Sequence, residues 1–366
     1  MIDPQPGAPT APPLPLVQLG YSAAFQTAFA HVAEADHVPA RVVAVHRDRL
    51  VVAGADGEFT ATLDTHLVHA GSLDRPASGD WIVLRLDPAG GSARVCALLP
   101  RRTAFIRAAA GKRAMAQVVA ANIDRVLVVS ALPTDLNERR LERYLVLAWE
   151  SGAVPMIVLT KCDLVDDAAG YVATVRALAP GVDVLAVSAS DEGGITELAS
   201  LLTPGETVAL LGSSGVGKST LVNRLAGESV MRTSEVDVDG RGRHTTTHRE
   251  LIRLPSGVLV IDTPGMRELQ LWSADAGLDQ VFEEVVELGR SCRFADCGHT
   301  QEPGCAVTAA VANGQLSAER LASWRKLVRE MARARLQQDA VASSAERARL
   351  RAMMRAVRAN AKSRDK

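Results

Sequence analysis

The architecture of this chain follows from residues 207–219, TVALLGSSGVGKS, in which an apolar run of strand length ends in a glycine-rich loop. A helical pattern continues from Thr220 to Leu225, so strand, loop and helix succeed one another. The loop fits G-x-x-x-x-G-K-[ST], which binds phosphates through successive backbone N–H groups. Lys218 is expected to reach the outer phosphates and the Ser219 hydroxyl to bind Mg²⁺. The expected nucleotide contacts are Gly212, Ser213, Ser214, Gly215, Val216, Gly217, Lys218, Ser219 and Thr220.

A second motif, TKCD at residues 160–163, indicates which base is bound. It stands at the end of the strand-like run VPMIVLT and fits [NT]-K-x-D. The carboxylate of Asp163 can accept hydrogen bonds from guanine N1–H and the 2-amino group, a pair of donors that adenine lacks. The next apolar run ends in VSA, which matches a small loop that contacts the base through a main-chain amide. The expected guanine site consists of Thr160, Lys161, Cys162, Asp163, Ser188 and Ala189.

The γ-phosphate side of the site is predicted from two further elements. DTPG at residues 262–265 closes the run VLVID, so Asp262 is expected to hold the water on Mg²⁺ and the Gly265 amide to meet the γ-phosphate. HTTT at residues 244–247 lies between the P-loop and this strand, where a switch threonine binds Mg²⁺ only when the γ-phosphate is present. Thr246 is the expected ligand, and the threonines on either side of it are the alternatives.

Unalternated apolar runs separated by helical stretches predict a parallel sheet with both faces covered. The runs lie at residues 125–132, 154–160, 182–188, 207–211 and 257–262, and helical patterns at Glu138–Glu150 and Ala168–Leu178. Ordinary GTPases place the P-loop first and the guanine motif near the end, whereas here TKCD and VSA precede the P-loop. The sequence therefore predicts a circularly permuted P-loop GTPase sheet.

Residues 40–100 show a different pattern, with five short β-like runs broken by Gly, Asp and Pro. Such a pattern predicts a small closed barrel. An oligonucleotide-binding (OB) barrel is expected, and an SH3-like barrel is the alternative that the number of strands does not separate from it. The runs are residues 40–45, 50–52, 59–63, 81–86 and 93–98.

A Cys/His cluster follows the nucleotide motifs. Three of the five cysteines fall within fourteen residues, in the spacing C-x4-C-x-H-x5-C. Three thiolates and one imidazole are the ligand set of a closed, tetrahedral structural Zn²⁺ site. Reduced cysteines without a metal are the alternative. The expected zinc ligands are Cys292, Cys297, His299 and Cys305.

A barrel, permuted nucleotide motifs and a Cys/His loop in this order resemble the RsgA (YjeQ/YloQ) family of small ribosomal subunit-dependent GTPases. The resemblance spans roughly residues 40–310 and includes GRxRHTTT at residues 240–247 and QVVAANID at residues 117–124. It implies a multidomain α/β chain with an OB-like barrel, a GTPase domain and a zinc-knuckle and helical domain. It also implies GTP hydrolysis stimulated by the small ribosomal subunit, contact with its rRNA, and a role in its late maturation.

Met266 follows DTPG at the position where Ras-like enzymes keep the glutamine that orients the attacking water. A thioether does not perform that role. As the resemblance suggests, we expect His244 to supply the missing group when the ribosome orders the switch. The alternative is that His244 only contacts phosphate or RNA.

The charge of the chain is unevenly distributed. The net charge is −1, yet residues 317–366 contain 14 Lys or Arg against 5 Asp or Glu. A basic segment of this kind is typical of contact with a polyanion, and a solvated helix is the alternative. Further RNA contacts are expected between the barrel and the GTPase motifs and in the switch: Arg101, Arg102, Arg107, Lys112, Arg113, Arg241 and Arg243.

No apolar run approaches the ~20 residues of a membrane-spanning helix, and the first 16 residues, rich in Pro and Ala, lack a secretory-signal pattern. We expect a cytoplasmic monomer that binds GTP and GDP. The expected domains are a Pro-rich extension (1–38) with one helix at 23–33, the barrel (39–103), the GTPase domain (104–277) and the zinc-binding, basic helical domain (278–366). Two rival functions stay open: an rRNA-binding assembly factor that uses GTP only as a switch ligand, and a P-loop ATPase or kinase.

Overall fold

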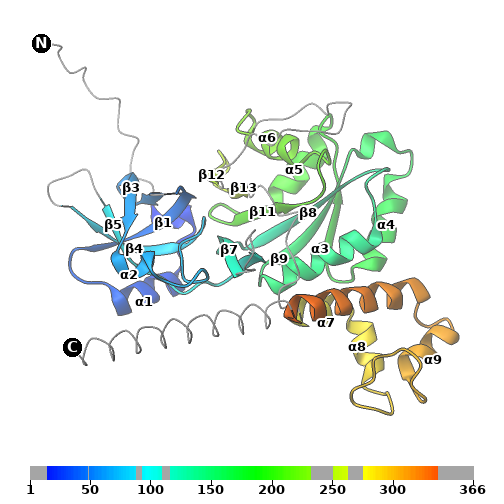
Figure 1. The fold of residues 1–366 in the computed structure, drawn as a ribbon. Coiled ribbons are helices and arrows are strands. Elements are labelled where there is room, and N and C mark those ends of the chain that lie inside the picture. Colours follow the sequence, from blue (N-terminus) through cyan, green and yellow to red (C-terminus); the bar gives the residue numbers. More distant parts are fainter. Residues whose placement is uncertain are drawn as a thin grey trace, which may run out of the picture. The chain divides into compact units, whose positions relative to one another are not determined.

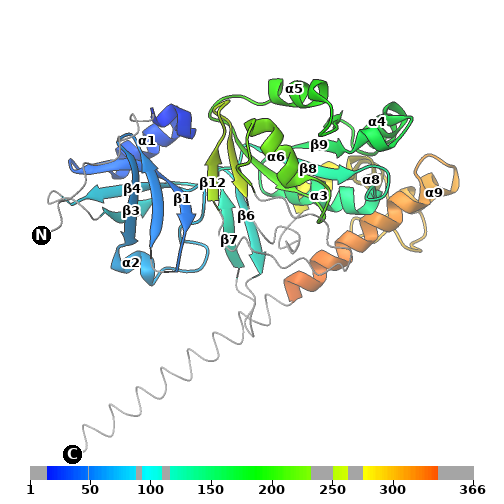
Figure 2. The ribbon, with the colours of Figure 1, turned by 90° about the horizontal axis from the view of Figure 1, so that it is seen from above.

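A computed structural model describes residues 15–47, 49–87, 93–108, 116–231, 250–262 and 275–336. The chain forms two compact units, Met1–Phe105 with Val118–Glu268, and Ile106–Gln117 with Leu269–Lys366. The first unit carries the barrel and the nucleotide motifs, and the second carries the Cys/His cluster (Figures 1 and 2).

Five strands close into the predicted barrel. Their order is β1-β2-β3-β5-β4, and the ring is closed because β1 also pairs with β4. β3 and β5 are parallel, whereas the other neighbours are antiparallel. This order is that of the OB barrel, which decides between the two predicted barrels. The elements are β1 (His37–Val45), β2 (Leu50–Gly54), β3 (Gly57–Leu63), α2 (Thr65–Val68), β4 (Trp81–Leu86) and β5 (Ala93–Leu98).

An N-terminal segment packs against this barrel. It consists of η1 (Leu16–Leu19) and α1 (Ala23–Val32), so the helix expected at residues 23–33 is confirmed. Phe25 is buried, and its ring centroid lies 5.8 Å from that of Trp81 in β4. The described part of the predicted extension is therefore part of the barrel's packing.

The sheet that carries the nucleotide motifs has the predicted permuted connectivity. Its order is β10-β9-β8-β11-β13-β12, and only the β12–β13 pair is antiparallel. The P-loop strand β11 lies in the middle, with strands that precede it in the chain on one side and strands that follow it on the other. The bounds are β8 (Arg125–Ala131), β9 (Val154–Thr160), β10 (Asp183–Ala186), β11 (Thr207–Leu211), β12 (Glu250–Arg253) and β13 (Leu259–Asp262).

Helices cover both faces of this sheet. In Figure 1, α5 and α6 lie on one face and α3 and α4 on the other, as right-handed crossovers require when the connections change direction after β10. α5 and α6 bury Ile195, Leu198, Leu221 and Val222 against the sheet. The bounds are α3 (Glu138–Glu150), α4 (Ala168–Leu178), α5 (Glu192–Ser200) and α6 (Lys218–Ala226).

The barrel and this sheet are joined through the backbone and through one buried cation. Strand β1 pairs with β12 at Ala44 and Glu250, which makes one continuous eleven-stranded sheet. The Arg41 guanidinium is 1% exposed and donates to three backbone carbonyls from different segments. Burial lowers the pKa of Arg41 to about 10, although nearby Asp124 and Asp80 oppose the shift. The carbonyls belong to Leu19 (2.5 Å), Gly79 (3.2 Å) and Asn122 (3.0 Å).

A two-stranded sheet, β6 (Ala104–Ala108) and β7 (Ala116–Ala121), follows the barrel and was not expected as a pair of strands.

In the second unit, α7 (Asp275–Val281), α8 (Glu283–Gly289) and α9 (Ala306–Ala312) precede a helix at residues 318–336. Their core is formed by Leu278, Phe282, Val285, Val307, Leu321, Leu327 and Met331. Among the residues described, no helix is long and apolar enough to cross a membrane.

Candidate functional site

The glycine-rich loop connects β11 to α6, as its pattern predicts. Gly217 caps α6 with a left-handed backbone (φ 94°), a conformation that costs other residues free energy. At Gly212 a Cβ atom would lie 2.3 Å from the carbonyl oxygen of Val129 in β8, so a side chain does not fit there. The loop therefore needs glycine at both positions for its shape.

Lys218 is the first residue of α6, and its ammonium lies over the loop that precedes it. The Nζ atom donates to the carbonyl oxygens of Gly212 (2.9 Å) and Ser213 (2.6 Å). Ser219 and Thr220 follow in the first turn of α6 and are half-buried. The structure thus brings together the charged and hydroxyl groups that the sequence assigned to phosphate and Mg²⁺.

The end of β9 joins the base motif to the phosphate loop. Thr160 is 6% exposed, and its Oγ1 donates to the carbonyl oxygen of Val216 at 2.6 Å. The same hydroxyl lies 3.4 Å from the carbonyl oxygen of Ser130 at the end of β8. Two motifs that are about fifty residues apart in sequence therefore form one site.

The predicted guanine-binding carboxylate is oriented by a neighbouring hydroxyl. Ser188 donates from Oγ to Oδ1 of Asp163 at 2.5 Å, and the Cys162 amide donates to the carbonyl oxygen of Val187. Lys161 has a left-handed backbone (φ 58°) that starts the short helix η2 (Cys162–Leu164). Asp163 remains exposed, so it can meet a ligand.

Ser188 has a role that the sequence did not predict, because only a main-chain contact of the VSA loop was expected. The signal was present as a hydroxyl at the end of the strand next to TKCD. Its Oγ also lies 2.7 Å from Oγ of Ser190 and accepts from the Ser190 amide. Ala189 between them is exposed. The serine pair thus fixes the carboxylate from the side of β10.

The γ-phosphate side is described only in part. Asp262 ends β13, which pairs in parallel with β11, so its backbone lies at the same edge of the sheet as the P-loop. The other predicted residues of this side, and several basic ones, lie outside the described residues: His244, Thr246, Gly265, Lys112, Arg113, Arg241 and Arg243.

Arg101 differs from its predicted role as an RNA contact. It donates to both carboxylate oxygens of the buried Asp80 at 2.7 Å and to the carbonyl oxygens of Leu73 and Arg75. Its side chain is only 17% exposed, so the guanidinium is used within the barrel. Arg102 is more than half exposed, and its contact with Asp124 is long at 3.5 Å.

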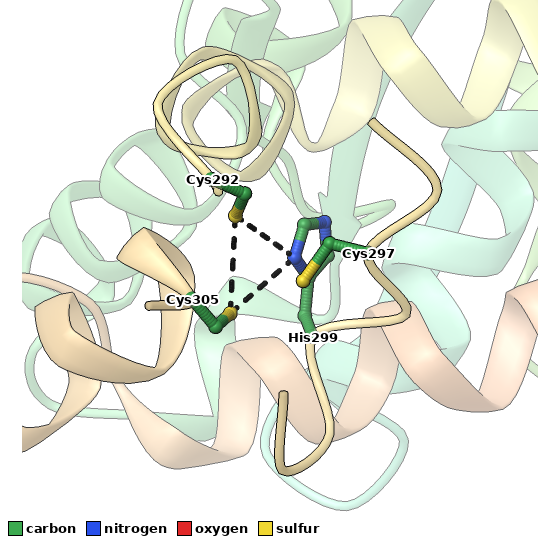
Figure 3. Close-up of side chains that lie close together, drawn as sticks. All are labelled: Cys292, Cys297, His299 and Cys305. Atoms are coloured by element: carbon green, nitrogen blue, oxygen red, sulfur yellow. Dashed lines mark hydrogen bonds between the residues drawn. The ribbon is translucent and has the colours of Figure 1, made fainter. Parts of the chain in front are cut away.

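The four predicted metal ligands converge (Figure 3). Their ligand atoms all lie within 4.8 Å of one another. The Nδ1 atom of His299 is 3.5 Å from Cys292 Sγ and 3.6 Å from Cys305 Sγ, and these two sulfurs are 3.9 Å apart. A tetrahedron with Zn–S of ~2.3 Å and Zn–N of ~2.0 Å has edges of ~3.8 Å and ~3.5 Å. The cluster could therefore hold a zinc ion.

The surroundings of the cluster position its ligands. The Trp324 ring lies 5.2 Å from the His299 ring, and Arg325 donates to the His299 carbonyl oxygen, so the helix at 318–336 supports this ligand. Cys305 caps α9 and accepts from the Thr308 amide. Burial raises the pKa of the Cys305 thiol, but hydrogen bonds from Thr308 and His299 favour the thiolate more strongly. The net effect lowers the pKa of Cys305 to about 6. A thiolate is the form that binds metal.

Comparisons with known proteins agree with this arrangement. The family model described as RsgA GTPase matches residues 98–272. A second model, described as ABC transporter, matches residues 196–361, a span that contains the P-loop but not TKCD. A protein of Opitutus terrae, named "Small ribosomal subunit biogenesis GTPase RsgA", is 47% identical over 94% of this chain and 97% of its own.

Solved structures share the fold. The chain aligns with YjeQ from Thermotoga maritima at a TM-score of 0.61 and 25% identity, over 81% of this chain and 98% of that one. YloQ, described as a circularly permuted GTPase, aligns at a TM-score of 0.59 and 23% identity, over 82% of this chain and 97% of its own.

Proposed function

Because the chain belongs to the RsgA GTPase family, we propose that it hydrolyses GTP to GDP and phosphate in the biogenesis of the small ribosomal subunit. The observation that carries the nucleotide part is the bond from Thr160 Oγ1 to the Val216 carbonyl oxygen, which joins the base motif to the P-loop. The proposal that the small ribosomal subunit is the partner rests on the near-full-length similarity to relatives named for small-subunit biogenesis.

The nucleotide is held by two groups of residues. Asp163, oriented by Ser188, accepts from the guanine base, and the Lys161 stem covers the base plane. Cys162 and Ala189 contribute main-chain contacts beside them. The P-loop from Gly212 to Thr220 holds the phosphates, and Lys218 moves from the loop carbonyls to the outer phosphates.

Hydrolysis uses the groups at the γ-phosphate. Mg²⁺, when bound with GTP, neutralises charge that develops on the phosphate oxygens. Ser219 and Thr246 are its proposed protein ligands, with Asp262 acting through a water and the Gly265 amide meeting the γ-phosphate. His244 orients the attacking water in place of the residue that Met266 does not provide.

Zinc, one ion per chain, is proposed to have a structural role. All four ligand positions are filled by protein, which leaves no open position for a reacting molecule. We further propose that the chain acts as a cytoplasmic monomer, in the four domains given by the sequence, and contacts small-subunit rRNA through the barrel, the metal loop and the basic tail.

The experiment is GTP hydrolysis by the full chain, alone, with purified small subunits and with purified large subunits. Turnover stimulated by small subunits only is expected. Unstimulated turnover with intact binding to small subunits would favour the rival function, an rRNA-binding factor for which GTP is a switch ligand. Competition with excess ATP tests the ATPase alternative, and no loss of GTP binding is expected.

A matched pair of variants tests the role of His244. His244→Ala should abolish stimulation by small subunits while GTP binding stays intact. His248→Ala, a histidine four residues further along the same segment, is the control and should keep the stimulation. Full stimulated turnover in His244→Ala would overturn the catalytic role and leave this histidine as a phosphate or RNA contact.

A further inference from the structure

The metal loop presents an aromatic ring to solvent. Phe294 lies between the ligands Cys292 and Cys297, and it is 41% exposed although its side chain is large and apolar. The Arg293 guanidinium lies over this ring, 5.4 Å from its centroid. An exposed aromatic ring covered on one face by a cation is a cation–π pair.

Backbone hydrogen bonds on both sides order the segment that carries this pair. The Arg293 amide donates to the Gly304 carbonyl oxygen at 3.1 Å, and the Cys297 amide donates to the Phe294 carbonyl oxygen at 3.3 Å. Gly304 has a left-handed backbone (φ 80°), and a Cβ atom there would lie 3.1 Å from Cβ of Arg293. Because the backbone of the pair is ordered before binding, no loop-ordering entropy is lost there when a partner binds.

Three other arginines of this unit are engaged in ion pairs. Arg290 pairs with Glu287, Arg320 with Glu284 and Arg335 with Asp275. Among the residues that the structure describes, Arg293 forms no such ion pair, and its partner is the ring. Its N–H donors therefore remain available beside an aromatic surface.

We propose that Arg293 and Phe294 together bind an unpaired nucleobase of single-stranded RNA, with Phe294 stacking on the base and Arg293 contacting base or phosphate. Aromatic rings next to arginines are the groups that bind single-stranded nucleic acid without reference to its sequence. An apolar protein groove would bury the guanidinium without a partner, which is costly. The inference rests on the proposed function, because small-subunit rRNA is the expected source of that base.

Ring chemistry tests the proposal in the full-length, zinc-loaded protein. Phe294→Leu keeps an apolar side chain but removes the ring, whereas Phe294→Trp keeps a ring. Affinity is measured by anisotropy for a labelled single-stranded RNA of mixed sequence and by cosedimentation for purified small subunits. Phe294→Leu should weaken both affinities by roughly 5- to 150-fold, the range for losing one base stack, and Phe294→Trp should keep them near the wild-type level.

Further variants control for charge and surface change. Arg293→Ala should weaken binding and reduce the salt dependence by about one phosphate contact. Leu201→Ala removes a side chain that is also 41% exposed, but in the first unit, and should change nothing. Zinc content and basal GTP hydrolysis should stay at the wild-type level in each variant.

The outcomes separate this inference from the proposed function. Wild-type affinity of Phe294→Leu for both probes would overturn the inference and leave the GTPase assignment untouched. Loss of affinity for subunits alone would identify a protein contact and also overturn it. Ring-dependent binding to the RNA by a protein that ignores small subunits would support the inference and contradict the proposed partner.

Discussion

Thr160→Val removes one hydroxyl at the junction of the base motif and the P-loop and keeps the shape of the side chain. Thr160 is buried, and its hydrogen bond to the Val216 carbonyl oxygen is 2.6 Å long. Val216 is also buried, so the variant leaves a carbonyl without its partner. The expected loss in the free energy of unfolding is ~1–3 kcal/mol. For a GTPase unit of this size this lowers the melting temperature by roughly 2–12 °C.

Loss of the same hydrogen bond should also lower the affinity for nucleotide. Without it, bound nucleotide must order two parts of the site that the wild type holds together. The free energy of nucleotide binding then becomes less favourable by up to the whole free energy of the bond. At ~1.4 kcal/mol per factor of ten, the affinity for nucleotide falls by roughly 5- to 150-fold. The assay is a fluorescence titration with a labelled GDP analogue, together with thermal unfolding of the same samples.

Two control variants make this prediction specific. Thr160→Ser keeps the hydroxyl and should keep nucleotide affinity. Thr174→Val makes the same substitution on the exposed surface of α4, where the hydroxyl bonds the Gly170 carbonyl oxygen at 3.0 Å, and should cost less than ~0.5 kcal/mol. Unchanged affinity and melting temperature in Thr160→Val, or equal losses in Thr160→Ser, would refute the structural role assigned to this bond.

Three further perturbations have expected outcomes. Asp163→Asn should weaken GTP binding at least ~100-fold and favour xanthosine triphosphate, because an amide matches the exchanged donor and acceptor of xanthine; competition titrations measure it. Chelation of zinc should unfold the metal loop and shift Trp324 emission, since that ring packs on His299; unchanged emission with full loss of zinc would contradict it. Burial and the nearby Asp163 and Asp191 raise the pKa of the Cys162 thiol, so its thiolate fraction at pH 7.5 is below that of an ordinary cysteine. We expect Cys162 to be alkylated more slowly than a cysteine in a peptide, with a rate that rises above pH 9; peptide mass spectrometry measures it.

The elements that the sequence predicted well are those whose signal is local. Runs such as VPMIVLT and TVALL are bounded by motif residues, and β9 and β11 have the predicted ends. The permuted connectivity followed from motif order, because TKCD and VSA precede the P-loop in the chain. The convergence of the Cys/His cluster was also predictable, since its residues lie within one loop of the sequence.

What the sequence did not predict depends on contacts between distant segments. As a basic residue after the barrel, Arg101 looked like an RNA contact in the sequence. Its ion pair with the buried Asp80 can be recognised only once the barrel has formed. Arg41 likewise joins carbonyls from three segments that no local pattern relates. Ser188 was predicted as part of a loop, whereas its bond to Asp163 needs β9 and β10 side by side. Such roles come from tertiary contacts rather than periodicity.

The central position of β11 also has a consequence for how the protein is made. β8, β9 and β10 leave the ribosome before β11, and roughly 75 residues separate the end of β8 from β11, its second neighbour in the sheet. At ~5–20 residues per second, β8 keeps one unpaired apolar edge for about 4–15 s during synthesis. Such an edge can pair with other chains, so the permuted order of the strands exposes a half-built sheet to wrong pairing while translation continues.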